Sequence, residues 1–258
     1  IPLAAQTFSK SSMNFVFGAS PLFISRGKGA FTWDIDNNKF IDYLLGLLPI
    51  ILGHCDKDVD DAIKNQLKKG ITFSLSNQLE FQLAKQLSTI IPCAENTRFA
   101  KNGSDVTTAA IRLARAVTGK ERIATCGYHG WHDWYIGTTT RNLGVPKSEM
   151  KLTSKFNYND ISSLEKVLRK HKGEFAAVIL EPFINVEPTN NFLSILRKIC
   201  DDQNIILIFD EIVTGFRINL GGAQTYYNVI PDLACFGKAM GNGMPISALV
   251  GKKIYMDK

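Results

Sequence analysis

The stretch Ile205–Glu211 (IILIFDE) consists of five consecutive apolar residues followed by two carboxylates. An isoleucine-rich run of this length predicts a strand that is buried on both faces. Similar short apolar runs recur along the chain, and helical sequence patterns separate them. These runs are Arg98–Ala100, Arg122–Cys126, Phe175–Leu180, Leu233–Phe236 and Ile246–Val250. The alternation predicts an α/β protein with a mostly parallel sheet and helices on both of its faces.

Four helices are expected between and before these strands, at about 59–69, 77–91, 104–117 and 160–170. Asn77 with Glu80 predicts the start of the second, and Ser104 and Asp160 are expected to cap the third and fourth. The beginning of the chain differs, with short strands expected at 22–24 and 30–34 and a turn at 36–38. We therefore expect residues 1–70 to form an N-terminal arm and small subdomain, and residues 71–258 to form the large domain.

Composition excludes several classes of protein. The 258 residues are 45% hydrophobic and 21% charged, which is typical of a globular protein. The net charge of +6 comes from scattered lysines and arginines, so nucleic acid is not an expected partner. No apolar run is long enough for a membrane span, and no secretory signal is visible. The five cysteines are odd in number and far apart, which favours free thiols, no zinc site and a soluble, cytoplasmic protein.

The residues that follow the predicted strands are chemically distinctive. In open α/β sheets, ligands bind beyond the carboxyl ends of the strands, so these residues are candidates for a site. In chain order they are Lys101–Ser104, Gly127–His132, Glu181, Asp210–Glu211 and Gly237–Lys238. The ends of five strands therefore provide a possible anion cradle, an aromatic–histidine run, two sets of carboxylates and a lysine.

Each of these features also has a simpler explanation. Asn102–Ser104 fits a turn and a helix cap as well as a phosphate site at a helix N-terminus. Tyr128–His132 fits aromatic packing, and its two histidines lack a third metal ligand at a matching spacing. Most lysines lie at the surface, but Lys238 follows an apolar strand and precedes the small-residue run Ala239–Gly243. Partial burial there would lower the pKa of the amine and make it nucleophilic.

A nucleotide hydrolase is the alternative from a different class, because Asp210–Glu211 resembles the acidic end of a Mg²⁺-binding strand. That function requires a Gly-x-x-x-x-Gly-Lys-Ser/Thr loop. Gly119-Lys120 is followed by Glu121, and Gly237-Lys238 is followed by Ala239. The phosphate-binding loop is therefore missing, which makes this alternative a distant one.

Pyridoxal phosphate (PLP) requires the combination that the strand ends offer: a phosphate site, a stacking aromatic ring, a carboxylate for the pyridine nitrogen and a lysine for a Schiff base. Four motifs, Lys101–Asp105, Gly127–Gly130, Ile208–Arg217 and Phe236–Ala239, resemble those of the class III PLP-dependent aminotransferases, most of all the glutamate-1-semialdehyde aminomutase branch. The resemblance extends over essentially the whole chain. It implies a fold-type I enzyme, a homodimer, and an amino donor and a carbonyl acceptor as small-molecule substrates.

The resemblance also implies roles for individual residues. Lys238 would form the Schiff base and move protons, and Asp210 would pair with the pyridine nitrogen. Glu211 is expected to matter less for turnover than Asp210. The cofactor-binding roles fall to Gly103 and Ser104 for the phosphate, Tyr128 and Ile212 for the two faces of the ring, and His129 and Glu181 for positioning. No metal ligand is implied.

The chain departs from the family in three ways. Val213 stands where many members have glutamine, and the arm Ala4–Ser9 lacks the arginine that binds substrate carboxylate in the aminomutase. Family members are also longer, with a C-terminal small domain, so a truncated, weakly active PLP-binding fragment is an alternative. Polar residues in the arm and nearby loops (Gln6, Thr7, Ser9, Ser74, Ser76, Asn77) favour a polar carbonyl substrate, such as a sugar-derived one, over the aminomutase reaction. Alternatively, these residues only cap helices.

Overall fold

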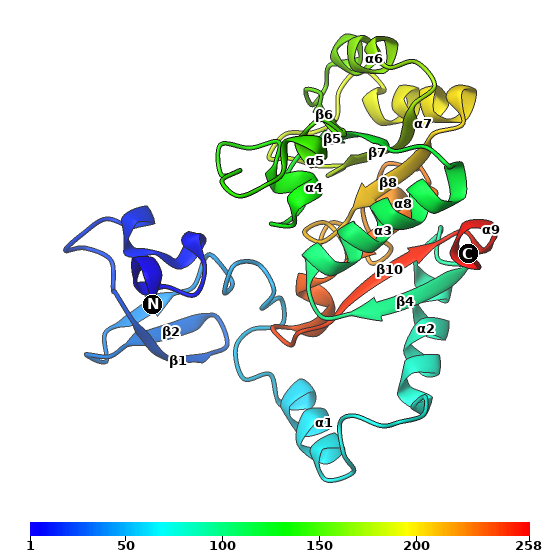
Figure 1. The fold of residues 1–258 in the computed structure, drawn as a ribbon. Helices are drawn as coiled ribbons and strands as arrows, with labels where there is room; N and C mark the ends of the chain where they lie inside the picture. Colours follow the sequence, from blue (N-terminus) through cyan, green and yellow to red (C-terminus); the bar gives the residue numbers. More distant parts are fainter. The chain divides into compact units, whose positions relative to one another are not determined.

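The computed structural model describes all 258 residues, which divide into two compact units, Ile1–Thr72 and Phe73–Lys258. Figure 1 shows the ribbon coloured along the sequence, with the first unit in blue to cyan. No helix in the structure combines the length and the apolarity that a membrane span requires.

The N-terminal unit contains a three-stranded antiparallel sheet. Its elements are the 3₁₀ turns η1 (Pro2–Ala4), η2 (Phe8–Lys10) and η3 (Ser12–Asn14), the strands β1 (Ile24–Lys28), β2 (Phe31–Asp34) and β3 (Lys39–Ile41), and the helix α1 (Lys57–Leu67). The predicted turn at 36–38 lies between β2 and β3, where the Asp34 carboxylate accepts hydrogen bonds from the amides of Asp36 and Asn38. The strand predicted at 22–24 begins only at Ile24. None of the apolar side chains of this unit is buried.

The larger unit is built on a seven-stranded sheet in the order β4-β10-β9-β8-β7-β5-β6. Its strands are β4 (Asn96–Ala100), β5 (Arg122–Cys126), β6 (Thr153–Lys155), β7 (Phe175–Leu180), β8 (Ile206–Asp210), β9 (Leu233–Phe236) and β10 (Ser247–Gly251). The strands from β5 to β9 pair in parallel, which confirms the predicted sheet type. Strand β10, however, runs antiparallel to both β9 and β4. Its direction was not predictable, because every residue of β10 is buried, as in the parallel strands.

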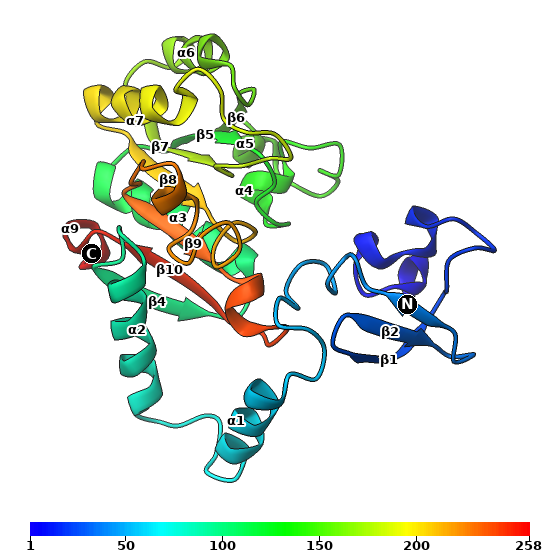
Figure 2. The same cartoon turned by 180° about the vertical axis from the view of Figure 1, so that it is seen from behind.

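Helices cover both faces of this sheet. They are α2 (Gln78–Ile90), α3 (Gly103–Thr118), α4 (Asp133–Ile136), α5 (Lys147–Met150), α6 (Ile161–Lys170), α7 (Phe192–Gln203), α8 (Ala223–Tyr226) and α9 (Lys253–Met256), with the 3₁₀ turn η4 (Lys238–Gly241). Alternate residues of β8 belong to two separate cores. Ile206 and Ile208 pack with α3, whereas Leu207 and Phe209 belong to the cluster that includes α2, α6 and α7. Figure 2 shows the sheet and its covering helices from the opposite side.

Local hydrogen bonds cap the starts of α2, α3 and α6, and one of the three predicted caps was wrong. Asn77 and Asp160 cap α2 and α6 as predicted. Helix α3, however, is capped by Asn102 and not by Ser104, because the amide of Asn102 donates to the Asp105 carboxylate at 2.9 Å. Ser104 therefore lies within the first turn of α3. Helix α7 was missed because Asn191 before it, at φ 58°, provides no side-chain cap that the sequence could reveal.

Candidate active site

The carboxyl ends of β5, β7, β8 and β9 lie at one edge of the sheet, because these neighbouring strands are parallel. The residues that follow them are Gly127, Glu181, Asp210 (itself the last residue of β8) and Gly237-Lys238. Helix α3 begins near the same residues, as the contacts below show. The fold thus assembles the candidate residues from widely separated parts of the sequence (Figure 1).

Asp210 is only 3% exposed, and its carboxylate contacts the imidazole of His129. His129 Nδ1 lies 2.7 Å from Asp210 Oδ2, and His129 Nε2 lies 3.0 Å from the carbonyl oxygen of Cys126. The second carboxylate oxygen of Asp210 accepts a hydrogen bond from the amide of Ile212 at 3.1 Å. Both oxygens of this buried carboxylate are therefore fixed by hydrogen bonds, which suits recognition of a cationic donor.

Glu181 follows β7 and accepts a hydrogen bond from the backbone amide of Tyr128 at 2.8 Å. Burial raises the pKa of the Glu181 carboxyl, and the charge of Asp210 raises it further. Gly127 makes this contact possible, because a Cβ there would lie 2.6 Å from Glu181 Oε2. Tyr128 itself is 60% exposed, and its ring lies nearly perpendicular to that of Tyr135 at a centroid distance of 5.7 Å. Its aromatic face is thus available to a flat ligand.

Lys238 follows β9 at a backbone φ of 41°, a left-handed conformation that is costly for a lysine. Burial lowers the pKa of its amine, while the charges of Asp210 and Glu181 raise it and that of Arg217 lowers it. Both carboxylates are engaged elsewhere, Asp210 with His129 and Glu181 with Tyr128. The environment therefore increases the neutral, nucleophilic fraction of this amine relative to that of an exposed lysine.

The start of α3 lies beside the same strand ends. A Cβ on Gly103 would lie 3.2 Å from the Ile212 side chain, and one on Gly237 would lie 3.0 Å from it. Ile212 therefore packs between the start of α3 and the residue before Lys238. As at any helix start, the first amides of α3 lack intrahelical acceptors, and the dipole favours an anion there.

Ser104 links α3 to the loop after β5. Its hydroxyl accepts a hydrogen bond from the amide of Trp131 at 3.4 Å, and a Cβ on Gly130 would lie 2.1 Å from this oxygen. The hydroxyl of Thr107, one turn further along α3, donates to the carbonyl oxygen of His129 at 3.0 Å. The sequence analysis did not assign roles to Gly130 or Thr107. A glycine directly after Tyr128-His129 could have indicated a close backbone approach at position 130.

Glu211 has a different environment from its neighbour Asp210. It is 0% exposed and accepts hydrogen bonds from the amides of Ala223 and Gln224 at 2.7 and 3.0 Å and from the Thr214 hydroxyl at 2.5 Å. Burial raises the pKa of this carboxyl, and the hydrogen bonds oppose the shift. Glu211 thus holds the loop after β8 against the start of α8, which is a structural role.

The polar residues considered for substrate recognition are in part structural. The Thr7 hydroxyl accepts a hydrogen bond from the amide of Ser9 at the start of η2, and Asn77 caps α2. Thr7 and Asn77 therefore act as helix caps, as the simpler explanation expected, and they provide no information about the substrate.

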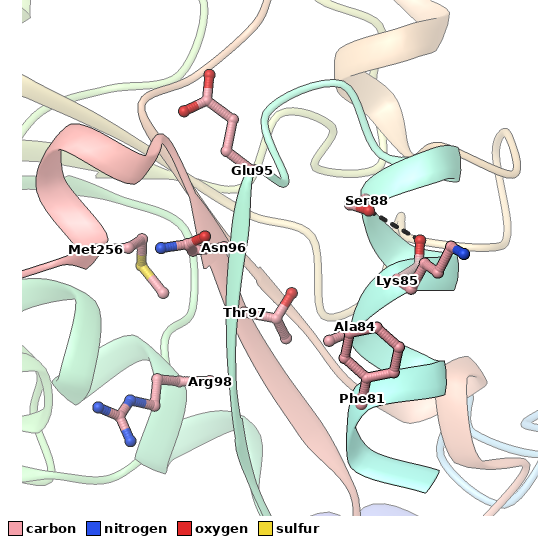
Figure 3. Close-up of a pocket in the computed structure, with 9 residues that line it drawn as sticks. All are labelled: Phe81, Ala84, Lys85, Ser88, Glu95, Asn96, Thr97, Arg98 and Met256. Atoms are coloured by element: carbon pink, nitrogen blue, oxygen red, sulfur yellow. Dashed lines mark hydrogen bonds between the residues drawn. The ribbon is translucent and has the colours of Figure 1, made fainter. Parts of the chain in front are cut away.

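A pocket of about 450 Å³ lies beside α2 and the edge strand β4 (Figure 3). Its lining includes Phe81, Glu95, Arg98 and Met256, and none of the candidate residues. The hydroxyl of Ser88 in its wall donates to a carbonyl within α2 itself. The pocket is therefore separate from the strand-end site.

Comparison with known proteins identifies the wider group. The aminotransferase class-III family matches residues 16–258. A 3-aminobutyryl-CoA aminotransferase of Cloacimonas acidaminovorans (strain Evry) is 44% identical over 94% of this chain and 60% of its own length. A glutamate-1-semialdehyde 2,1-aminomutase of Methanococcus maripaludis (strain C6) is 40% identical over 94% of this chain and 60% of its own length.

A solved structure shows the same architecture. The FumI protein of Sphingopyxis sp. MTA144, in its PLP internal aldimine form, is 32% identical with a TM-score of 0.91, over 96% of this chain and 61% of that one. The chain thus spans about 60% of the length of the curated relatives that it matches.

Proposed function

The chain belongs to the class-III aminotransferases, and from this membership we propose that it holds PLP and transfers an amino group between an amino donor and a carbonyl compound. The observation that supports this most directly is the placement of Lys238 and Asp210 after adjacent strands, where burial lowers the pKa of the lysine and hydrogen bonds hold the carboxylate. A nucleotide hydrolase would also use a carboxylate at a strand end, but it would not need the buried lysine with a lowered pKa.

The residues present fit the chemical groups of PLP. A phosphate matches the open amides at the start of α3 and the Ser104 hydroxyl, where glycine at 103 leaves room beside Ile212. A protonated ring nitrogen matches the buried carboxylate of Asp210, which already accepts a hydrogen bond from the Ile212 amide. An aldehyde matches the amine of Lys238, and the exposed ring of Tyr128 offers an aromatic face.

In the proposed mechanism, bound PLP supplies an electron-withdrawing ring that stabilises negative charge on the substrate carbon. Lys238 would hold the cofactor through its aldehyde group, and its amine would carry protons to and from the substrate carbon. Asp210 would keep the ring nitrogen protonated. Gly103 and Ser104 would hold the phosphate, Tyr128 and Ile212 would cover the two ring faces, and His129 and Glu181 would position the surrounding groups.

We also propose functions for the two units, an assembly and a location. Residues 71–258 would be the PLP-binding large domain and residues 1–70 an arm and small subdomain that contacts a second copy of the chain. Two observations support this: the N-terminal unit buries none of its own apolar side chains, and Phe15, Phe17 and Phe23 are all exposed. Four of the five free cysteines are buried, which is consistent with a reducing, cytoplasmic compartment. Light scattering at micromolar concentration should show a dimer, and a monomer would contradict the proposed assembly.

Two substrate classes have support from named relatives: a 3-aminoacyl-CoA thioester and glutamate 1-semialdehyde. A polar or sugar-derived carbonyl compound is the third candidate. The aminomutase reaction is less favoured, because Ala4–Ser9 contains no arginine to pair with a buried substrate carboxylate.

The visible absorption spectrum of the purified chain with PLP tests the proposed class of function. We expect a protein-bound yellow chromophore whose visible absorption spectrum changes when an amino donor is added. A colourless protein after incubation would overturn the proposal. A panel of 3-aminobutyryl-CoA, glutamate 1-semialdehyde and keto-sugars with glutamate then separates the substrates.

A further inference from the structure

One face of the three-stranded sheet in the N-terminal unit is both aromatic and basic. In β2 every second residue is buried, so Phe31 and Trp33 share the opposite face of the strand. The antiparallel register places Lys28 opposite Phe31, and it places both Arg26 and Lys39 opposite Trp33. Residues that pair across antiparallel strands lie on the same face of the sheet. These five residues therefore form one surface, which we call the basic–aromatic face.

The cations of this face lie against the rings and not against carboxylates. The guanidinium carbon of Arg26 lies 4.5 Å from the centre of the Trp33 ring, and Lys39 Nζ lies 3.7 Å from the centre of the Phe31 ring. None of the ion pairs in the structure includes Arg26, Lys28 or Lys39. A contact with a neutral ring orients a cation but does not compensate its charge. The face therefore keeps a positive charge that an anionic ligand can pair with.

A pocket of about 550 Å³ beside this face gives a ligand room to bind. Lys28, Phe31, Trp33 and Lys39 belong to its lining, and Leu52 adds apolar surface from the loop before α1. None of the three exposed phenylalanines proposed for the contact with a second copy lines this pocket. The pocket thus combines aromatic and apolar surface with cations that have no ion-pair partner.

The other charged or ionisable side chains around the pocket already have partners. Lys57 Nζ pairs with the Asp61 carboxylate at 2.6 Å, and His54 Nε2 lies 2.9 Å from the Asp42 carboxylate. The carboxylate of Asp56 caps the start of α1. The charges that remain for a ligand are therefore the cations of the basic–aromatic face.

This combination matches one end of a coenzyme A (CoA) thioester. That end contains an adenine ring, a diphosphate and a phosphate on the ribose. Flat bases pack against aromatic side chains, and phosphates bind lysine and arginine. Glutamate 1-semialdehyde and a simple keto-sugar have neither a base nor a phosphate. Among the substrate classes considered for the proposed function, the CoA thioester is the one that would use both parts of the pocket.

We propose that the basic–aromatic face and its pocket bind the adenosine phosphate end of a CoA thioester substrate. This inference rests on the proposed function, whose substrate class it names. The phosphates would bind Lys28 and Lys39, and the adenine ring would pack against Trp33 and Leu52. Because the cation–π contact already orients Lys39, less side-chain freedom is lost when the ligand binds.

The first test measures CoA binding to the PLP-loaded chain by calorimetry. CoA should bind with an affinity that falls as the salt concentration rises. Lys28→Gln and Lys39→Gln should each weaken CoA binding by roughly tenfold, because each removes one charge-assisted contact with a phosphate. Both lysines are exposed, so the Tm of each variant should stay that of the wild type.

Lys10→Gln is the matched control, because it makes the same charge change at an exposed position of η2 that does not line the pocket. Its CoA dissociation constant should equal that of the wild type. The absence of CoA binding to the wild type, or an equal loss of affinity in the control and the two pocket variants, would overturn the inference.

A comparison of ligands separates CoA from a free nucleotide. ADP keeps the adenine ring and the diphosphate but lacks the phosphate on the ribose and the pantetheine arm. CoA should bind at least about tenfold more tightly than ADP, because it makes at least one further charged contact. Pantetheine alone should not bind at this face. Equal dissociation constants for CoA and ADP would contradict the assignment to CoA.

Kinetics with 3-aminobutyryl-CoA connect the pocket to turnover. The loss of affinity in Lys39→Gln should appear in KM, since Lys39 would hold a part of the substrate that does not react. An unchanged KM in this variant would contradict a substrate role. A chain that binds PLP at Lys238 but does not bind CoA contradicts this inference alone. A chain that binds CoA but not PLP contradicts the proposed function.

Discussion

Gly130→Ala tests whether the loop after β5 and the start of α3 form one binding surface. Gly130 has a φ of 99°, and an added Cβ would lie 2.1 Å from Ser104 Oγ and 3.1 Å from Ser104 Cα. Because the second of these atoms belongs to the backbone, the clash cannot be relieved by side-chain rotation alone. The loop that contains Tyr128 and His129 must move away from α3.

The expected magnitude has two parts. The left-handed conformation costs a non-glycine residue about 1–2 kcal/mol. Forcing extra volume into a packed contact adds typically about 1–3 kcal/mol. Gly173→Ala is the matched control, since Gly173 has a φ of 83° with nothing within 4 Å of the added Cβ. The two variants should differ by about 2 kcal/mol, which corresponds to a Tm difference of roughly 4–8 °C for a chain of this size.

The assays are thermal unfolding and PLP titration of the wild type and both variants. We expect Gly130→Ala to bind PLP at least about tenfold more weakly than Gly173→Ala, because it displaces Ser104 from the proposed phosphate site. Equal Tm values would show that Gly130 does not pack against α3. Equal PLP dissociation constants would refute the assignment of Ser104 to the phosphate.

Three further predictions concern the carboxylates. Asp210→Asn should leave a folded protein and lower turnover by roughly 10²-fold or more, as expected for loss of one electrostatic catalytic contact; near-normal turnover would make Asp210 structural. Glu211→Gln places a side-chain NH₂ group against the backbone amides that now donate to the Glu211 carboxylate. The variant should therefore lose about 2–3 kcal/mol of the free energy of unfolding, measured in urea, while the folded fraction binds PLP with unchanged affinity. Glu181→Gln removes a negative charge that raises the pKa of Lys238, so the pH profile of Schiff-base formation should move to lower pH, while Glu165→Gln leaves it in place; a shift to higher pH would contradict the assigned sign.

Much of the site was predictable because it follows the strand order. Asp210 comes directly after one apolar run and Lys238 comes one residue after another, and parallel strands bring such positions to one edge of the sheet. The placement of Ser104 was only partly predictable. The sequence predicted Ser104 as the cap of α3, whereas the hydrogen bond from the Asn102 amide to the Asp105 carboxylate makes Asn102 the cap.

Long-range contacts account for what the sequence did not reveal. The pairing of His129 with Asp210 joins residues 81 positions apart, and no local pattern encodes it. The same holds for the contact of Ile212 with Gly103 and Gly237, which depends on the order of the strands. Glu211 and Asp210 are adjacent, chemically alike and both buried, and their hydrogen-bond partners show the structural role of Glu211 at the start of α8, which the sequence did not reveal.

The central claim is that Lys238 bonds PLP, and borohydride reduction followed by peptide mapping tests it most directly. Reduction of the PLP-loaded chain should fix the cofactor on the peptide that contains Lys238, and Lys238→Ala should abolish this labelling. Labelling of a different lysine, or no labelling of the wild-type chain, would contradict the account.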